Sequence, residues 1–229
     1  MIIKERDVLV GEVDDSFIIK VADEAYDCSK SIFFDLEHYV YKKPKCVGVF
    51  GACIYDKAKS ELVVTQYMIE NKYEIKDILI LAEKYFLNAY EEGKRYIVTF
   101  SGNNDFTVIN YLFNQYGIEF KFEDYFVSVD LQKEYEKLIK MGIGLKALEK
   151  KFDIVREGEL MSGSNLAKTF HKVIKDKDYI LRMPKEKIDK ILQYNEQDVV
   201  NLFHICMTWN KYIKLNENEG DNNSTCINE

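Results

Sequence analysis

Two acidic side chains, Asp35 and Glu37, stand at the end of an apolar run that begins at Ile32. Such a run is typical of a strand buried on both faces, and alternation along a strand places both carboxylates on one face. Two buried carboxylates are costly unless a positive partner neutralises them, and a divalent metal ion is one such partner. The alternative is a strand that ends in solvent, where Asp and Glu are common. The six residues from Ile32 to Glu37, taken alone, favour this simpler interpretation.

Asp105 and Asp198 are two further carboxylates that are candidates for a functional site. Asp105 follows a predicted buried strand, residues 96–100, and opens a predicted helix, where free amide groups and the helix dipole favour a carboxylate. A simple helix cap is the alternative for a lone Asp. Tyr194 and Asp198 are four residues apart and therefore share one face of a predicted helix. A single match to this spacing is weak evidence, because it arises often by chance.

The predicted elements that must position these residues form one sheet. Hydrophobic patterns predict an antiparallel meander of three strands, then two further strands, each preceded by a helix. The predicted strands are 32–37, 46–55, 61–68, 96–100 and 126–129, with helices at 73–90 and 105–116. Helical crossovers make the later strands parallel to the first. We therefore predict an α/β, ribonuclease-H-like mixed sheet, three antiparallel strands then two parallel, with helices on both faces and a site at the carboxyl ends of the central strands.

The rest of the chain frames this core. Helices are expected at residues 132–141, 145–152, 165–174 and 184–213. Residues 1–28 read as an N-terminal extension, with an edge hairpin formed by the apolar runs at residues 8–10 and 17–19. We expect one ribonuclease-H-like domain over residues 29–213. Residues 214–229 are polar and are predicted to be a disordered tail.

Composition limits the function classes. The chain has 229 residues and five cysteines without a CxxC pair. From the residues printed we expect neither a signal peptide nor a membrane span. A protein of the reducing cytosol is expected. The net charge of −7 argues against binding nucleic acid by phosphate neutralisation alone, but carboxylates that bind cations would be offset. A basic cluster lies at residues 42–45, and oligomeric state is not predicted.

The acidic positions are much more informative together than singly. Their order resembles the DEDD family of 3′→5′ exonucleases, in its Tyr-containing branch, and more narrowly the bacterial predicted ribonuclease-H-like exonucleases, over residues 29–212. The motifs that carry the resemblance are the DxE of Asp35 and Glu37, the helix-opening Asp105, Val129-Asp130-Leu131, Leu145 to Glu149, and Tyr194-Asn195 before Asp198-Val199.

The resemblance implies that Asp35, Glu37, Asp105 and Asp198 bind two Mg²⁺ or Mn²⁺ ions, and that Tyr194 positions the attacking water. Carboxylate oxygens suit these cations, and phosphodiester cleavage by two cations needs several convergent carboxylates. A phenol with a pKa near 10 is a poor base, so Tyr194 is expected to orient water. The implied partner is the 3′ end of DNA or RNA, single-stranded or frayed.

The chain also departs from the family pattern around the substrate pocket. His38 and Tyr39 follow the DxE where small residues are common, and Phe106 follows the helix-opening Asp. We expect these three residues to bind the terminal nucleotide. Asp130 and Asn195 are expected to support the site, although Asp130 is equally well explained as a turn residue.

Two other functions remain open. A domain of the same fold that binds nucleic acid without cutting it is one alternative, because fold does not guarantee function. An endonuclease of the same superfamily is the other, and it would need no grip on a strand end.

Overall fold

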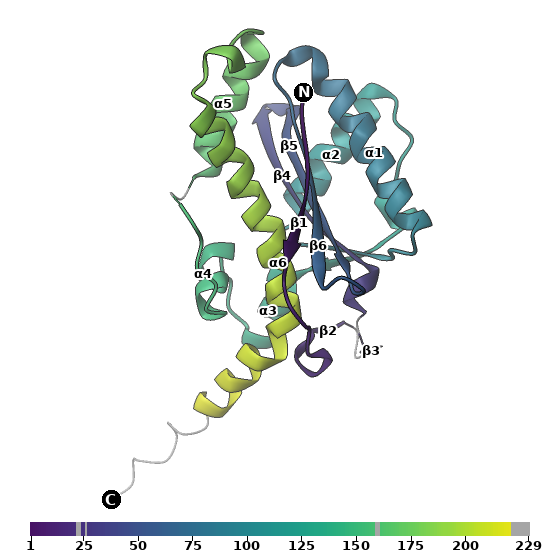
Figure 1. Ribbon diagram of the computed structural model, residues 1–229, viewed down its shortest axis with the longest axis vertical. Helices are drawn as coiled ribbons and strands as arrows, with labels where there is room; N and C mark the ends of the chain where they lie inside the picture. The colour runs from purple at the N-terminus through teal and green to yellow at the C-terminus, as the bar shows by residue number, and fades with distance from the viewer. Residues whose placement is uncertain (22–23, 26, 159–160, 221–229) are drawn as a thin grey trace, which may run out of the picture.

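A six-stranded mixed sheet forms the centre of the molecule in the computed structural model, which describes residues 1–21, 24–25, 27–158 and 161–220. The strand order is β1-β6-β5-β4-β7-β8 (Figure 1). β4 pairs antiparallel with β5 and parallel with β7, and β8 continues the parallel part. The strands are β1 (Ile2–Leu9), β4 (Ser31–Tyr41), β5 (Lys43–Asp56), β6 (Glu61–Met68), β7 (Tyr96–Thr99) and β8 (Val127–Asp130), with a separate small pair β2 (Lys20–Val21) and β3 (Glu24–Ala25).

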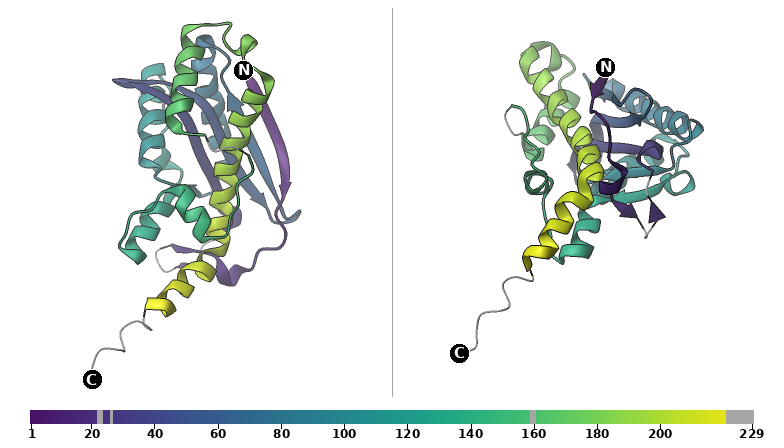
Figure 2. Two further views of the ribbon diagram at one scale, coloured as in Figure 1. Left: turned by 90° about the vertical axis from the view of Figure 1, so that its left-hand side faces the viewer. Right: turned by 60° about the horizontal axis from the view of Figure 1, so that its bottom comes forward.

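Helices cover both faces of this sheet. α1 and α2 lie on one face, and the long α6 crosses the other face together with α3 and α4 (Figures 1 and 2). The helices are α1 (Ile75–Glu91), α2 (Asn103–Tyr116), α3 (Leu131–Ile139), α4 (Leu145–Lys151), α5 (Gly163–Lys175) and α6 (Lys185–Gly220). Gly117 ends α2 with a φ of 70°, the left-handed conformation that glycine adopts without strain.

The central strand is apolar because both of its faces are packed. The ring of Phe33 meets Phe203 of α6 edge-on at 5.5 Å between centroids, whereas Phe34 meets Phe86 of α1 at 5.3 Å. Both phenylalanines on β4 are fully buried. Burying such a side chain contributes about 1.5–3 kcal/mol relative to leaving it exposed. These contacts fix which residues of β4 point toward α6.

The structure confirms the predicted fold class and corrects the chain ends. The N-terminal segment does not form the predicted edge hairpin, because β1 pairs along its whole length with β6 and adds a sixth strand to the sheet. The second apolar run instead packs on α6, where Ile19 N donates to the Cys206 carbonyl at 3.0 Å.

The C-terminal helix is longer than predicted. α6 ends at Gly220, so the prediction of a disordered segment is wrong for the backbone of residues 214–220. Residues 221–229 lie outside the described residues. Within the described part of the chain, no helix combines the length and the apolar character that crossing a bilayer requires.

Candidate metal centre

A pocket of about 480 Å³ opens beside the carboxyl end of β7 and the second half of β4. Its volume is within the range of ordinary small-molecule sites. Four carboxylates line it, and α2, α4, α5 and α6 contribute the other walls. The charged and aromatic side chains that line the pocket are Asp35, Glu37, His38, Phe100, Asp105, Lys146, Arg156, Tyr194 and Asp198.

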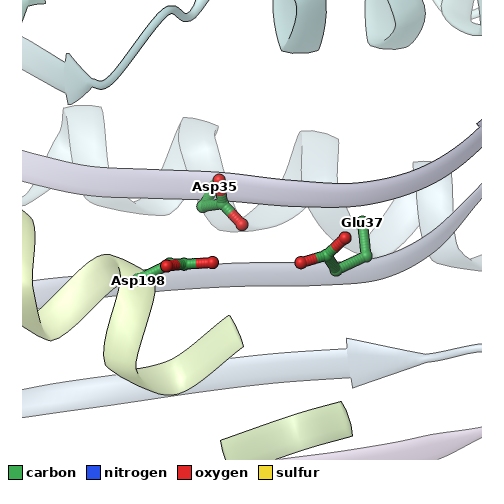
Figure 3. A group of neighbouring side chains, drawn as sticks. All are labelled: Asp35, Glu37 and Asp198. Carbon is green, nitrogen blue, oxygen red and sulfur yellow. The ribbon is translucent and has the colours of Figure 1, made fainter. Parts of the chain in front are cut away.

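Three of the four carboxylates converge on one point. One oxygen from each of Asp35, Glu37 and Asp198 lies within 4.8 Å of the other two. Figure 3 shows the two β4 side chains and the α6 side chain pointing toward one another. Glu37 and Asp198 are only 7% and 5% exposed. Three carboxylates at this distance, two of them buried and one partly buried, repel one another strongly unless protons or cations neutralise them.

Asp35 is held in place by an amide on the neighbouring helix. Asn195 Nδ2 donates to Asp35 Oδ2 at 3.1 Å, and Gln66 Nε2 donates to Asn195 Oδ1 at 2.8 Å. Asn195 is completely buried against Gly51, where an added Cβ would come within 2.0 Å of Asn195 Oδ1. Glycine at this position therefore lets α6 approach β5 closely enough for Asn195 to reach Asp35.

Burial and mutual repulsion shift the protonation of the cluster. Burial raises the pKa of Asp35 to about 6, against a lowering by the Asn195 hydrogen bond and the Arg156 charge. Burial, followed by the charge of Asp35, raises the pKa of Asp198 to about 8. The pKa of Glu37 rises for the same two reasons. Carboxyls with a raised pKa bind protons more readily than exposed carboxyls do unless a cation replaces the proton, and such pKa shifts are typical of functional sites.

Asp105 lines the same pocket from the first turn of α2, as predicted, but stands apart from the tight cluster. His38 Nε2 lies 3.9 Å from Asp105 Oδ1. Burial lowers the pKa of His38, so this contact is one with a neutral imidazole near pH 7. Burial also raises the pKa of Asp105, and the charges of Asp35 and Asp198 raise it further.

Asp130 fixes the loop that carries Asp105. Its Oδ1 accepts from Gln132 N at 3.1 Å, which caps α3, and from Ser101 N at 2.9 Å, which ties down the loop before α2. Ser101 has a φ of 56°, an uncommon conformation for a residue with a side chain. Asp130 is thus both a cap and a support for the loop, at a distance from the acidic cluster.

Tyr194 lines the pocket, and two cationic side chains lie near its ring. The Lys146 ammonium lies 5.2 Å from the ring centroid, and the Arg156 guanidinium carbon lies 5.1 Å from it. Burial, reinforced by the charge of Asp198, raises the pKa of Tyr194 above its ordinary value. The phenol is therefore a hydrogen-bond donor at neutral pH and not a base.

Two of the three residues predicted to bind nucleotide do not line the pocket. Tyr39 packs edge-on against His171 at 5.0 Å, and Phe106 packs against Phe122 at 4.9 Å. Register shifts between Glu37 and His38 and again after Tyr39 change the alternation of β4. Bulges of this kind re-aim side chains. As a result His38 faces the pocket, and Tyr39 turns to the core.

Three pocket residues escaped the sequence reasoning. Phe100 follows β7, Lys146 is in α4, and Arg156 is in the segment after α4. Phe100 lies only five residues before Asp105, and Lys146 lies inside the Leu145 to Glu149 motif, but neither residue type at its position indicated a role; Arg156 belongs to none of the motifs. The aromatic wall of the pocket is formed by Phe100 and Tyr194.

The cluster suits a divalent cation with oxygen ligands. Ligand oxygens of Mg²⁺ lie ~2.1 Å from the ion, so those on opposite sides are roughly 4 Å apart. The observed limit of 4.8 Å among Asp35, Glu37 and Asp198 is close to that spacing, within reach of small side-chain rotations. No thiol or imidazole lies in the group, which favours Mg²⁺ or Mn²⁺ over softer metals.

Comparison with known proteins gives one match. The family model described as the RNase_H superfamily matches residues 32–210. This segment includes the sheet from β4 onward and all four carboxylates of the pocket. No curated protein and no solved structure matches the chain.

Proposed function

This chain belongs to the ribonuclease H superfamily, whose members are usually nucleases, and we propose that it is a metal-dependent 3′→5′ exonuclease. The observation that carries the proposal is the convergence of Asp35, Glu37 and Asp198 within 4.8 Å in a pocket that Asp105 and Tyr194 also line. The motif resemblance to the Tyr-containing DEDD exonucleases supplies the direction of cutting.

In this proposal the four carboxylates hold two Mg²⁺ or Mn²⁺ ions. Bound ions of this kind lower the pKa of water and stabilise the leaving oxygen of a phosphodiester. Asp35, Glu37 and Asp198 hold one ion from the observed cluster, and Asp105 contributes to the second from the same pocket. Asn195 keeps the Asp35 carboxylate oriented.

The remaining pocket residues orient the reactants. The Tyr194 hydroxyl, protonated at neutral pH, donates a hydrogen bond that fixes the attacking water. Lys146 carries positive charge to the mouth of the pocket, where a phosphodiester must enter. Phe100 offers a face on which the terminal base stacks, in the role that the sequence suggested for Phe106.

The single-stranded nucleic acid that enters the site is expected to lie along the tip of the β4–β5 hairpin. This tip projects from one side of the molecule (Figure 2, left panel). Its exposed side chains are Tyr41, Lys42, Lys43 and Lys45, and the preceding Val40 lines the pocket. Lysines beside an exposed aromatic ring suit single-stranded nucleic acid, because cations hold phosphates and the ring stacks on bases.

The test is a 5′-labelled single strand, as DNA and as RNA, incubated with Mn²⁺ and compared with the same strand carrying an inverted 3′ nucleotide. A descending ladder from the free end alone is the expected result. Asp35→Asn should abolish it, whereas Asp189→Asn, at an exposed site on α6, should not. Internal fragments from a circular strand would instead identify an endonuclease, and binding without cutting would identify a scaffold domain.

We also propose that the protein acts in the reducing cytosol. Cys28, Cys46, Cys53 and Cys206 are buried free thiols. Burial raises the pKa of Cys28 to about 11 and that of Cys46 to about 12, which makes these thiols poor nucleophiles.

A further inference from the structure

Arg156 is the one arginine that lines the pocket, and it is almost completely buried, with 8% of its side chain exposed. Its Nε donates to Glu149 Oε2 at 2.7 Å, and its Nη2 donates to Glu149 Oε1 at 2.5 Å. The same Nη2 also donates to Asp198 Oδ1. One guanidinium thus joins an anchoring carboxylate of α4 to a carboxylate of the acidic cluster.

Glu149, the anchoring carboxylate, is paired with Arg156 and is not part of the acidic cluster. Glu149 is 2% exposed and also accepts from Asn201 Nδ2 at 2.9 Å. The paired bonds from Nε and Nη2 form the fork that makes arginine–carboxylate contacts strong. Asp198, by contrast, receives a single shared donor. The guanidinium can therefore leave Asp198 without losing its own counter-ion.

A divalent cation and the guanidinium compete for the same carboxylate. Asp198 contributes its oxygen to the group of three that lies within 4.8 Å, and it is also the acceptor from Arg156. Two cations a few ångströms apart repel each other strongly in a buried site. Binding of an ion at Asp198 is therefore disfavoured while the guanidinium remains beside this carboxylate.

We propose that Arg156 is a resident counter-ion that occupies Asp198 in the metal-free protein and thereby lowers the affinity of the site for divalent cations. This inference rests on the proposed metal-dependent function. The guanidinium can release Asp198 and stay paired, because its hydrogen bonds to Glu149 hold it. Its Nη1 is buried and has no hydrogen-bond partner among the described residues, so the guanidinium holds a free donor for an incoming anion.

The expected change in Mn²⁺ affinity follows from the fraction of time for which Asp198 is free of Arg156. When a site is competent to bind for only a fraction of the time, its apparent dissociation constant rises by the inverse of that fraction. If Arg156 occupies Asp198 for nine-tenths of the time or more, removing it should tighten Mn²⁺ binding by about tenfold or more. A guanidinium with a merely structural role would leave the affinity unchanged.

The test is the double variant Arg156→Gln/Glu149→Gln, which removes the cation and its anchoring charge together and leaves no unpaired charge at position 149. Mn²⁺ affinity is measured directly from the electron paramagnetic resonance signal of the free ion, without any substrate. We expect the dissociation constant to fall by about tenfold or more. Arg156→Lys, which keeps a cation without the fork, should give a smaller change and serves if the double variant does not fold.

Arg182→Gln is the matched control, since Arg182 is an exposed arginine paired with Asp176. It should bind Mn²⁺ with the wild-type affinity. An unchanged or weaker affinity in the Arg156 variants, with the wild type binding normally, would overturn the counter-ion role alone. If neither the wild type nor any variant binds Mn²⁺, the proposed function fails as well. Binding that appears only in the variants would support the inference in its strongest form.

Discussion

Removing one charge from the acidic cluster should stabilise the metal-free protein in a pH-dependent way. Asp35 ionises with a pKa of about 6 in the folded protein, raised by burial from an ordinary value of 3.8. The folded state therefore holds this proton more tightly than the unfolded chain does. The stability that the proton contributes is complete below about pH 4 and is lost as the pH rises through about 6.

The size of the effect follows from the same two pKa values. Each tenfold change in an ionisation constant corresponds to about 1.4 kcal/mol, so the change from 3.8 to about 6 amounts to about 3 kcal/mol. Asparagine at position 35 keeps the shape of the side chain and carries no charge. Asp35→Asn should match the wild type at about pH 3, exceed its free energy of unfolding by about half of this amount at pH 5, and exceed it by about 3 kcal/mol at pH 8.

The comparison of variant with wild type is essential, because other buried groups titrate in the opposite sense. Burial lowers the pKa of His38 and of His204 below the ordinary value of 6.5, so their contributions to stability rise as the pH increases toward that value. Urea unfolding with EDTA, followed by the fluorescence of Trp209, the only tryptophan, measures the difference at each pH. Asp189→Asn, at an exposed site, is the control.

Two results would contradict the reasoning. A difference between Asp35→Asn and wild type that stays constant from pH 5 to pH 8 would show that the carboxyl does not titrate in this range. An Asp35→Asn protein less stable than wild type at pH 8 would show that the charge is already compensated. Mn²⁺ at about 1,000 times its dissociation constant should reverse the order at pH 8, because binding to the wild-type cluster then adds roughly 4.1 kcal/mol.

Two further substitutions separate the roles of individual residues. Tyr194→Phe should lower turnover roughly 10²-fold or more and leave Mn²⁺ affinity intact, since the hydroxyl orients water, whereas Asp198→Asn should weaken both; equal behaviour in kinetics and in metal titration would refute the division of roles. Replacing Lys42, Lys43 and Lys45 with Gln should raise the KM for long single strands. The slope of log binding constant against log salt concentration should become shallower by about two, because each lost phosphate contact removes about 0.7 from it. Unchanged kinetics on a dinucleotide are the internal control, and an unchanged salt slope on long strands would exclude the hairpin tip from the binding path.

The sequence alone determined the features that depend on local periodicity. Asp35 and Glu37 lie two residues apart on an apolar strand, and alternation by itself puts both on one face with Phe33 behind them. The four-residue spacing of Tyr194 and Asp198 on a helix likewise needs no tertiary information. The order of strands and helical crossovers was sufficient for the mixed sheet.

Edge pairing and strand irregularities were decided in three dimensions. β1 joins the sheet because β6 offers an open edge for it, a pairing between segments some sixty residues apart that no local pattern encodes. No local pattern indicated the bulges of β4, and the alternation that places Asp35 and Glu37 on one face does not continue to Tyr39. A bulge is a compromise between two paired strands, so one strand's sequence does not specify it.

The electrostatics of the site were also a product of the tertiary structure. In the sequence Glu149 is only part of a helical motif and Arg156 belongs to no motif, yet folding brings the pair to Asp198, which belongs to another helix. Residue types and spacings specify which charges a chain has to place. The packing of α4 and α6 against the sheet decides which of those charges meet and how deeply they are buried, and burial is what makes their interaction strong.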